Sequence, residues 1–245
     1  MTADTTTLLY AGIHNSRYQL ERLLPVYEAG TLTEPHHPHA IAMLYRRLGV
    51  CQLLTTGSAE PLFEALRKGV SAFLLGLPRM AEDDKVTSRA GVLWDALVCD
   101  RWDAAVEIAR HSRSIVNPAW EHEDDFLYVW FLMTRYLRDD GSLDAEERQR
   151  DLLARWDDVL EGQHDPRRDL CEALLHRDTT AFRAAFEAVG DAREAELRRR
   201  LDDHALPTDV AAWALPVWLE GLALLRLAES DGLQTNGIAE NPCTR

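Results

Sequence analysis

Apolar residues recur at every third or fourth position along almost the whole chain, a spacing that places them on one face of an α-helix. The clearest run follows Pro38, where Ile41, Leu44 and Leu48 keep this spacing. The pattern predicts a first helix that starts near Asn15 or Ser16, a second from Pro38 to Gly57, a third from Ser58 to Pro78, and further helices at about 83–99, 102–114, 123–138, 144–161, 166–176, 178–189, 191–204 and 208–230. We therefore expect an all-α fold of about ten to eleven helices.

Short polar turns join several of these helices in the same way. Two aliphatic residues end one helix, a few polar residues follow, and an aromatic or small apolar residue begins the next helix, at 53–63, 97–105 and 174–182. A short turn makes neighbouring helices antiparallel, so each pair is an αα-hairpin. The sequence therefore predicts stacked antiparallel hairpins in a TPR-like or irregular α-solenoid, with an irregular helical bundle as the alternative. We expect residues 1–230 to form a single domain and the polar segment 231–245 to be a flexible tail.

The last predicted helix differs from the others because residues 216–228 are apolar on every side except at Glu220 and Arg226. A helix that is hydrophobic all round is buried all round, so this segment should pass through the centre of the domain. Pro216 cannot lie deep in a regular helix, so residues 208–214 should form a separate turn or one side of a kink. A buried carboxylate needs a partner, and we expect Glu220 to pair with an Arg or a His.

The composition supports the helical prediction and bears on the compartment. The chain has 37 Leu and 31 Ala against 13 Val and 5 Ile, so strong helix formers far outnumber the β-branched residues that favour strands. Uninterrupted apolar runs reach about ten residues, half of the roughly 20 that a membrane helix needs. The first residues lack the basic region and the apolar core of a signal peptide. We therefore expect a cytoplasmic protein.

The formal net charge of −14 disfavours nucleic acid and anionic membranes as partners and favours basic ones. Residues 81–125 are especially acidic, with 11 acidic and 5 basic side chains. Acidic residues in the first turn of a helix are favourable in their own right, and acidity also keeps a protein soluble, so a solvated helix start is the alternative explanation. The candidate partner-binding residues in this segment are Asp83, Asp84, Glu121, Glu123, Asp124 and Asp125.

Motifs for catalysis or metal binding are weak. The chain has no G-x-S-x-G, P-loop, G-x-G-x-x-G or H-E-x-x-H sequence. His36, His37 and His39 form a dense cluster, but prolines flank it and no carboxylate lies at helical spacing, so we expect a solvent-exposed helix start there. The dipeptide His164-Asp165 is similar to the dyad of all-α metal-dependent phosphohydrolases, although no second ligand pair accompanies it. We therefore expect no catalytic residue, no metal and no cofactor.

The four cysteines are widely spaced, at Cys51, Cys99, Cys171 and Cys243. No C-x-x-C pair occurs, so neither a zinc site nor a redox pair is indicated. Three of the four lie in apolar helical stretches, where a cysteine behaves as a small core residue.

Two parts of the chain resemble a known family. The residues HAIAMLYRRL at 39–48, continued by LFEAL at 62–66, resemble the paired N-terminal helices of the immunity protein 49 family. The residues WLEGLALLRLAE at 218–229 resemble its C-terminal helix. The resemblance implies an all-α protein that is encoded beside a bacterial polymorphic toxin and neutralises that toxin by binding it, without catalytic residues of its own.

The helical pattern, the acidic charge and the family resemblance together predict an immunity protein that is not an enzyme. We expect it to occlude the active site of a cognate toxin whose cleft is basic, because an acidic surface would suit such a cleft. Two other functions remain open on the sequence alone. One is a TPR-like adaptor or regulator that docks peptides, and the other is an all-α metal-dependent hydrolase built around His164 and Asp165.

Overall fold

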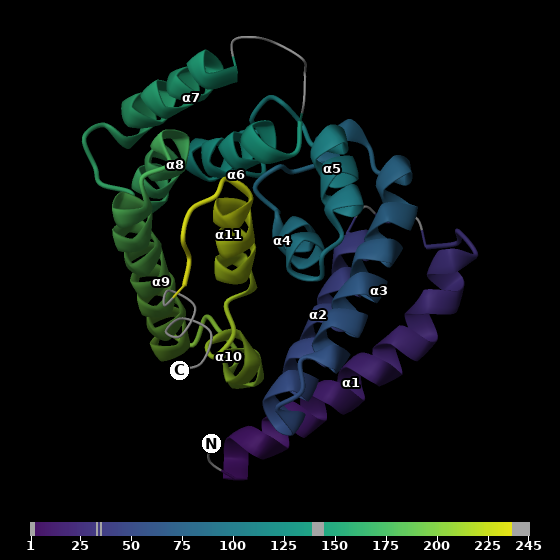
Figure 1. Cartoon of the computed structure of the whole chain (residues 1–245). Helices are drawn as coiled ribbons and strands as arrows, with labels where there is room; N and C mark the ends of the chain where they lie inside the picture. Colours follow the sequence, from purple (N-terminus) through teal and green to yellow (C-terminus); the bar gives the residue numbers. More distant parts are fainter. Residues whose placement is uncertain (1–2, 33, 35, 139–144, 237–245) are drawn as a thin grey trace.

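The computed structural model describes residues 3–32, 34, 36–138 and 145–236, and these residues form helices and connecting segments without any strand. The all-α prediction is therefore confirmed. Figure 1 shows the arrangement of the helices. They are α1 (Ala3–Glu28), α2 (His37–Thr56), α3 (Glu60–Gly76), α4 (Gly91–Val98), α5 (Trp102–His111), α6 (Glu123–Tyr136), α7 (Ala145–Leu160), α8 (Pro166–His176), α9 (Thr179–Asp202), α10 (Thr208–Ala214) and α11 (Leu219–Ser230), with two 3-10 turns, η1 (Leu77–Arg79) and η2 (Glu82–Asp84).

The three predicted hairpin turns are all present, between α2 and α3, α4 and α5, and α8 and α9. Gly57 ends α2 in the left-handed conformation, with φ of 72°, and its N–H donates to the carbonyl of Leu53. This is the usual way in which a glycine closes a helix. Helices α2 and α3 then approach closely at Gly49, where an added Cβ atom would lie 2.9 Å from Cβ of Ala65. The short turns therefore produce antiparallel, tightly packed pairs.

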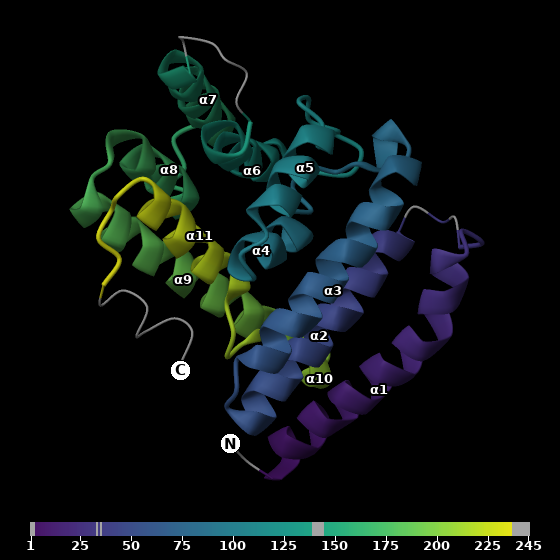
Figure 2. The same cartoon turned by 45° about the vertical axis from the view of Figure 1, so that its right-hand side comes forward.

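Helix α11 lies in the middle of the molecule, among α4, α6, α8 and α9 (Figures 1 and 2). Its residues Ala223, Leu224 and Ala228 are fully buried and belong to the main hydrophobic core. Helix α4 packs on both α11 and α3, and so connects the centre to the α2–α3 hairpin. The prediction that the C-terminal helix passes through the centre is confirmed. Helix α11 thus packs on α4, which lies more than 100 positions earlier in the chain, and a solenoid of nearest-neighbour repeats would not have such a contact.

Glu220 does have a partner, but it is neither an Arg nor a His. The hydroxyl of Tyr128 on α6 donates to Oε1 of Glu220 at 2.7 Å. Burial and the neighbouring Glu220 carboxylate raise the pKa of Tyr128 well above its usual value, which keeps the phenol protonated as a donor. The prediction that Glu220 pairs with an Arg or a His was therefore wrong, because the neutral hydroxyl of Tyr128 donates the hydrogen bond to this carboxylate.

Helix α1 begins at Ala3 and not near Asn15 or Ser16. The early part of the helix packs on α2, because Leu9 is buried and a Cβ atom on Gly12 would approach Sγ of Cys51 to 2.9 Å. Ser16 is itself buried inside the helix and does not cap its start. The first turns of α1 are polar and rich in threonine, a weak helix former. Packing against α2 therefore stabilises the helix in this part of the chain.

Two other predicted boundaries were wrong. Residues 83–99 are not one helix, since they contain the 3-10 turn η2, a connecting segment and α4. The two helices predicted at 178–189 and 191–204 are one, α9, because Gly190 continues the helix. A Cβ atom at Gly190 would lie 3.2 Å from the ring of Trp218, so this glycine allows close packing and does not end a helix. Residues 208–230 form two helices, α10 and α11, on either side of Pro216. The prediction that residues 208–214 are separated from the C-terminal helix at this proline is therefore confirmed.

The segment after α11 is packed and not frayed as far as the structure describes it. Asp231 accepts hydrogen bonds from Arg135 and from the hydroxyl of Tyr136, and Leu233 is buried in the main core. The tail predicted for 231–245 is therefore wrong for 231–236, and residues 237–245 lie outside the described residues. Cys243 also lies outside the described residues. Cys51, Cys99 and Cys171 are buried free thiols, as expected.

Residues 208–230 are long and apolar enough to cross a membrane by length and composition alone, with a mean hydropathy of 1.5. This stretch is divided between α10 and α11, and 56% of an apolar 18-residue part of it is buried inside the molecule. A buried core helix has the same composition as a membrane span, and we interpret the segment as the core helix.

Candidate partner-binding surface

The segment between α5 and α6 links the two acidic runs, although about 40 positions separate them in the chain. Asp83 lies in η2, and Glu121 lies just before α6. Arg113, between α5 and α6, donates to Oδ1 of Asp83 at 2.9 Å and to the carbonyl of Glu82 at 3.0 Å. Asn117 donates from its side chain to the carbonyl of Asp83 at 3.1 Å. We call Glu82, Asp83, Asp84, Glu123, Asp124 and Asp125 the acidic face. Its two parts, at η2 and at the start of α6, are linked through Asn117 and Glu121.

Glu121 has a structural role that its sequence position did not reveal. One carboxylate oxygen accepts from the backbone N–H of Ser88 at 2.9 Å, and the other accepts from the backbone N–H of Asn117 at 2.9 Å. Its side chain thus ties the segment before α4 to the segment before α6. A carboxylate used in this way is occupied within the chain, so Glu121 contributes less to a partner surface than predicted.

Asp124 and Asp125 at the start of α6 both contact one cation, Arg167 on α8. The distances from the guanidinium are 2.9 Å to Oδ2 of Asp124 and 2.6 Å to Oδ1 of Asp125. Asp165, which caps α8, also binds this guanidinium at 2.8 Å. Burial alone would lower the pKa of Arg167, but the hydrogen bonds with Asp165 and Asp125 raise it. Three carboxylates therefore share one cation, and this part of the acidic face is negative but internally paired.

The outermost carboxylates of the acidic face belong to η2. The side chain of Asp83 is 91% exposed and that of Glu82 is 74% exposed, even though they pair with Arg113 and Lys85. Glu123 is less exposed and pairs with Arg155 of α7. Asp83 and Glu82 are thus the residues of this face whose charge a partner would meet first.

Two exposed apolar residues in the segment between α5 and α6 were not predicted from the sequence. Ile115 and Trp120, in the segment between α5 and α6, are 69% and 63% exposed. They lie in a connecting segment without helical periodicity, so the spacing of apolar residues gave no signal. The only sequence signal for their exposure was that both residues flank Asn117 and Pro118, two residue types that favour turns at the surface.

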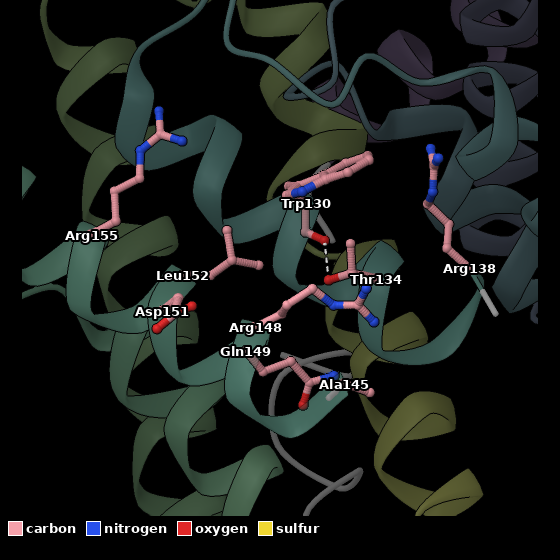
Figure 3. A pocket seen from close by; sticks show the side chains of 9 residues that line it. All are labelled: Trp130, Thr134, Arg138, Ala145, Arg148, Gln149, Asp151, Leu152 and Arg155. Atoms are coloured by element: carbon pink, nitrogen blue, oxygen red, sulfur yellow. Dashed lines mark hydrogen bonds between the residues drawn. The ribbon is translucent and has the colours of Figure 1, made fainter. Parts of the chain in front are cut away.

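A groove of about 410 Å³ lies between α6 and α7 (Figure 3). Its walls carry several guanidiniums, and Arg155 and Arg138 lie at opposite sides of it in Figure 3. Arg138 donates to the carbonyl of Ala109 at 2.9 Å and covers the ring of Trp130, and Arg155 pairs with Glu123. Because these two cations already stabilise the packing of neighbouring helices, we assign no ligand to the groove.

The residues considered for metal chemistry have other contacts. Asp165 caps α8 by accepting from the backbone N–H of Arg167, and Nε2 of His164 lies 2.8 Å from Asp169. Among the described residues no group of three or more His, Cys, Asp or Glu is placed to hold a metal ion. The proposed hydrolase dyad is therefore explained by the start of a helix.

His39 does not lie in solvent as predicted. It is half-buried in the first turn of α2, and its ring lies 4.8 Å from that of Phe73. Burial, and the nearby cations Arg89 and Arg46, lower the pKa of His39 to about 4. His36 is exposed, so the prediction holds for that residue.

The lowered pKa of His39 predicts sensitivity to acid. The unfolded chain takes up a proton near pH 6.5 and the folded chain only near pH 4, so stability is lost as the pH falls through this window. Because of this residue, the free energy of unfolding should fall by about 2 kcal/mol between pH 7 and pH 5. In His39→Gln the fall in stability over this range should be smaller by that amount. Urea unfolding at both pH values measures it, with the exposed His164→Gln as control. Equal losses in His39→Gln and the parent would contradict the prediction.

Comparison with known proteins places the chain in a family. No curated protein and no solved structure matches it significantly. The family model of Immunity protein 49 matches residues 46–237, which include the acidic face, the central helix and most of the hairpins, and the chain therefore belongs to the Immunity protein 49 family.

Proposed function

We propose that this protein binds the toxin encoded beside it and neutralises that toxin by occluding its active site. The observation that carries the proposal is the match to an immunity protein family over residues 46–237. We place the protein in the cytoplasm of the producing cell, where it would meet the toxin before secretion.

The acidic face supports a basic cleft as its target. The chain has a net charge of −14, and the most exposed carboxylates of this face, Glu82 and Asp83, project from one 3-10 turn. Complementary charge steers association and disfavours wrong partners. A toxin that acts on an anionic substrate has a cleft of this kind, and the acidic face would take the place of the substrate.

Coexpression tests the proposal directly. The toxin domain encoded by the adjacent gene is expressed alone and together with this protein, and growth is compared. We expect protection, a stable complex of defined stoichiometry in light scattering, and competition between this protein and the substrate of the purified toxin. Growth arrest despite coexpression, with no complex, would overturn the proposal. A complex that leaves substrate turnover intact would overturn only the occlusion of the active site.

Charge reversal at η2 should slow association. We expect Glu82→Lys with Asp83→Lys to lower the association rate with the toxin by about tenfold or more at low salt, since unsteered encounter falls to about 10⁵–10⁶ M⁻¹s⁻¹. At high salt the variant and the parent should converge because the field is screened. Asp124 and Asp125 are less suitable, since reversing them would remove two of the three carboxylates that bind Arg167 and place positive charges beside it.

A matched control for this variant is available on α7. Glu146→Lys with Glu147→Lys makes the same change of charge at an exposed helix start away from the acidic face. Surface plasmon resonance across a salt series compares the two double variants. If both variants slow association equally, the effect comes from net charge alone and η2 is not the surface that faces the toxin.

A further inference from the structure

We infer that Ile115 and Trp120 are the apolar anchors of the interface with the toxin, and that they insert into an apolar socket on a basic protein surface. This inference rests on the proposed function and specifies the surface and the partner chemistry. Both residues lie in the segment between α5 and α6, which also carries Arg113 and Asn117, the two residues that bind Asp83 and its backbone.

The first observation is their exposure together with the burial of their neighbours. Ile115 is 69% and Trp120 63% exposed, whereas Asn117 is buried and Val116 packs on the main core. The segment therefore has an inner side that belongs to the fold and an outer side that presents two large apolar groups. Trp is among the residue types most enriched at the energetic centre of interfaces.

The second observation is that hydrogen bonds hold this segment in place. Thr87 donates to the carbonyl of Arg113 at 2.8 Å, and Glu121 accepts from the backbone N–H of Asn117 at 2.9 Å. The backbone N–H of Trp120 donates to the carbonyl of Asn117 at 2.9 Å, which closes a turn. A segment that is already ordered loses little conformational entropy on binding, so exposed side chains on it make efficient anchors.

The third observation is the charge around the two residues. Arg113 and Asn117 attach the segment that carries Ile115 and Trp120 to Asp83, whose side chain is 91% exposed. The guanidinium of Arg89 lies over the ring of Trp120, 5.9 Å from its centroid. An apolar centre with a charged rim is the usual composition of a protein interface. The exposed carboxylates of η2 favour a basic partner, and the net charge of −14 opposes a second copy of this chain.

Alanine variants test the anchors by their effect on affinity. We expect Trp120→Ala to weaken binding of the purified toxin domain at least about 30-fold, mainly through faster dissociation. Ile115→Ala should weaken it less, and the double variant should weaken it most. Isothermal titration and plasmon resonance measure these changes. Tyr10→Ala is the matched control, because Tyr10 is a 59% exposed aromatic residue on α1.

The outcomes separate this inference from the proposed function. Melting temperatures of all variants should stay close to that of the parent, because the truncated side chains are exposed. If the parent chain does not bind the toxin domain, the proposed function fails. If the parent binds and Trp120→Ala binds equally well, the anchors have been placed on the wrong surface. Sedimentation of the parent alone gives a further outcome. A dimer that Trp120→Ala dissociates would show that a second copy occupies this surface, and would overturn the inference.

Discussion

Replacing Trp218 by alanine should lower the free energy of unfolding by about 3–5 kcal/mol. Trp218 is 2% exposed, and its ring centroid lies 4.9 Å from that of Phe186. Gly190 and Gly221 leave room for the ring, since a Cβ atom on Gly221 would approach it to 2.3 Å. Removal of the indole would therefore leave a cavity that its rigid surroundings cannot fill. A domain has a total stability of about 5–15 kcal/mol, so the variant should be close to unfolding at 37 °C.

A charge in the same core should be at least as damaging. Leu224 in α11 is fully buried, and Leu224→Asp would place an unpaired carboxylate among apolar side chains. The matched control is Leu75→Asp, because Leu75 on α3 is 43% exposed. This substitution should change the free energy of unfolding by about 0.5 kcal/mol or less. Guanidinium unfolding followed by far-UV circular dichroism measures all three variants. If Leu224→Asp unfolds at the same denaturant concentration as Leu75→Asp, α11 is not the core of the fold.

The central helix could be predicted from the sequence because its signal is local. Residues 216–228 are apolar on every face, and no other environment than a core or a membrane accommodates such a helix. The hairpin turns were predictable for a similar reason, since a short polar turn leaves antiparallel packing as the simplest arrangement. The same segment, residues 218–229, is the one that resembles the C-terminal helix of the Immunity protein 49 family, so the family could also be recognised from a local sequence pattern.

The boundaries that were wrong depend on contacts between distant residues. Gly190 looked like a helix end, but its role is to admit the ring of Trp218, which is 28 positions away. The start of α1 looked polar, but Leu9 is buried and Gly12 makes room for the thiol of Cys51. A glycine can either end a helix or allow close packing, and only the tertiary structure decides between them.

The candidate surface was predicted in part. The acidic residues were identified, and the structure brings Asp83 close to the start of α6 through Arg113 and Asn117. The number of internal ion pairs could not be predicted, because Arg167 lies about 40 positions from Asp124. Trp120 was missed because a connecting segment has no periodicity from which exposure can be inferred.

A buried ion pair near the α2–α3 hairpin provides the second large effect. Nε of Arg46 donates to Oδ1 and Oδ2 of Asp95 at 2.9 and 3.1 Å, and Asp95 in α4 is 2% exposed. The guanidinium also binds the carbonyl of Gly91. Arg46→Met keeps much of the side-chain volume but leaves the carboxylate uncompensated. We expect a loss of about 3–5 kcal/mol of unfolding free energy at pH 7.

The loss should shrink on acidification. Burial raises the pKa of Asp95 and Arg46 opposes this effect, so removal of Arg46 should raise the pKa further. The folded variant then binds a proton at a pH at which the unfolded chain does not, and its stability relative to the parent recovers as the pH falls through this window. Arg46 also lowers the pKa of His39. The comparison is therefore made in the His39→Gln background, which removes that contribution.

A second substitution separates the stranded charge from lost packing. Asp95→Asn combined with Arg46→Met removes both charges, and the double variant should be more stable at pH 7 than Arg46→Met alone, because a neutral amide costs less to bury than an unpaired carboxylate. Urea unfolding of the single and double variants at pH 7 and pH 5 completes the cycle. A loss in Arg46→Met that is independent of pH and unchanged by Asp95→Asn would show that the packing of the arginine stem, and not its charge, stabilises the contact between α2 and α4.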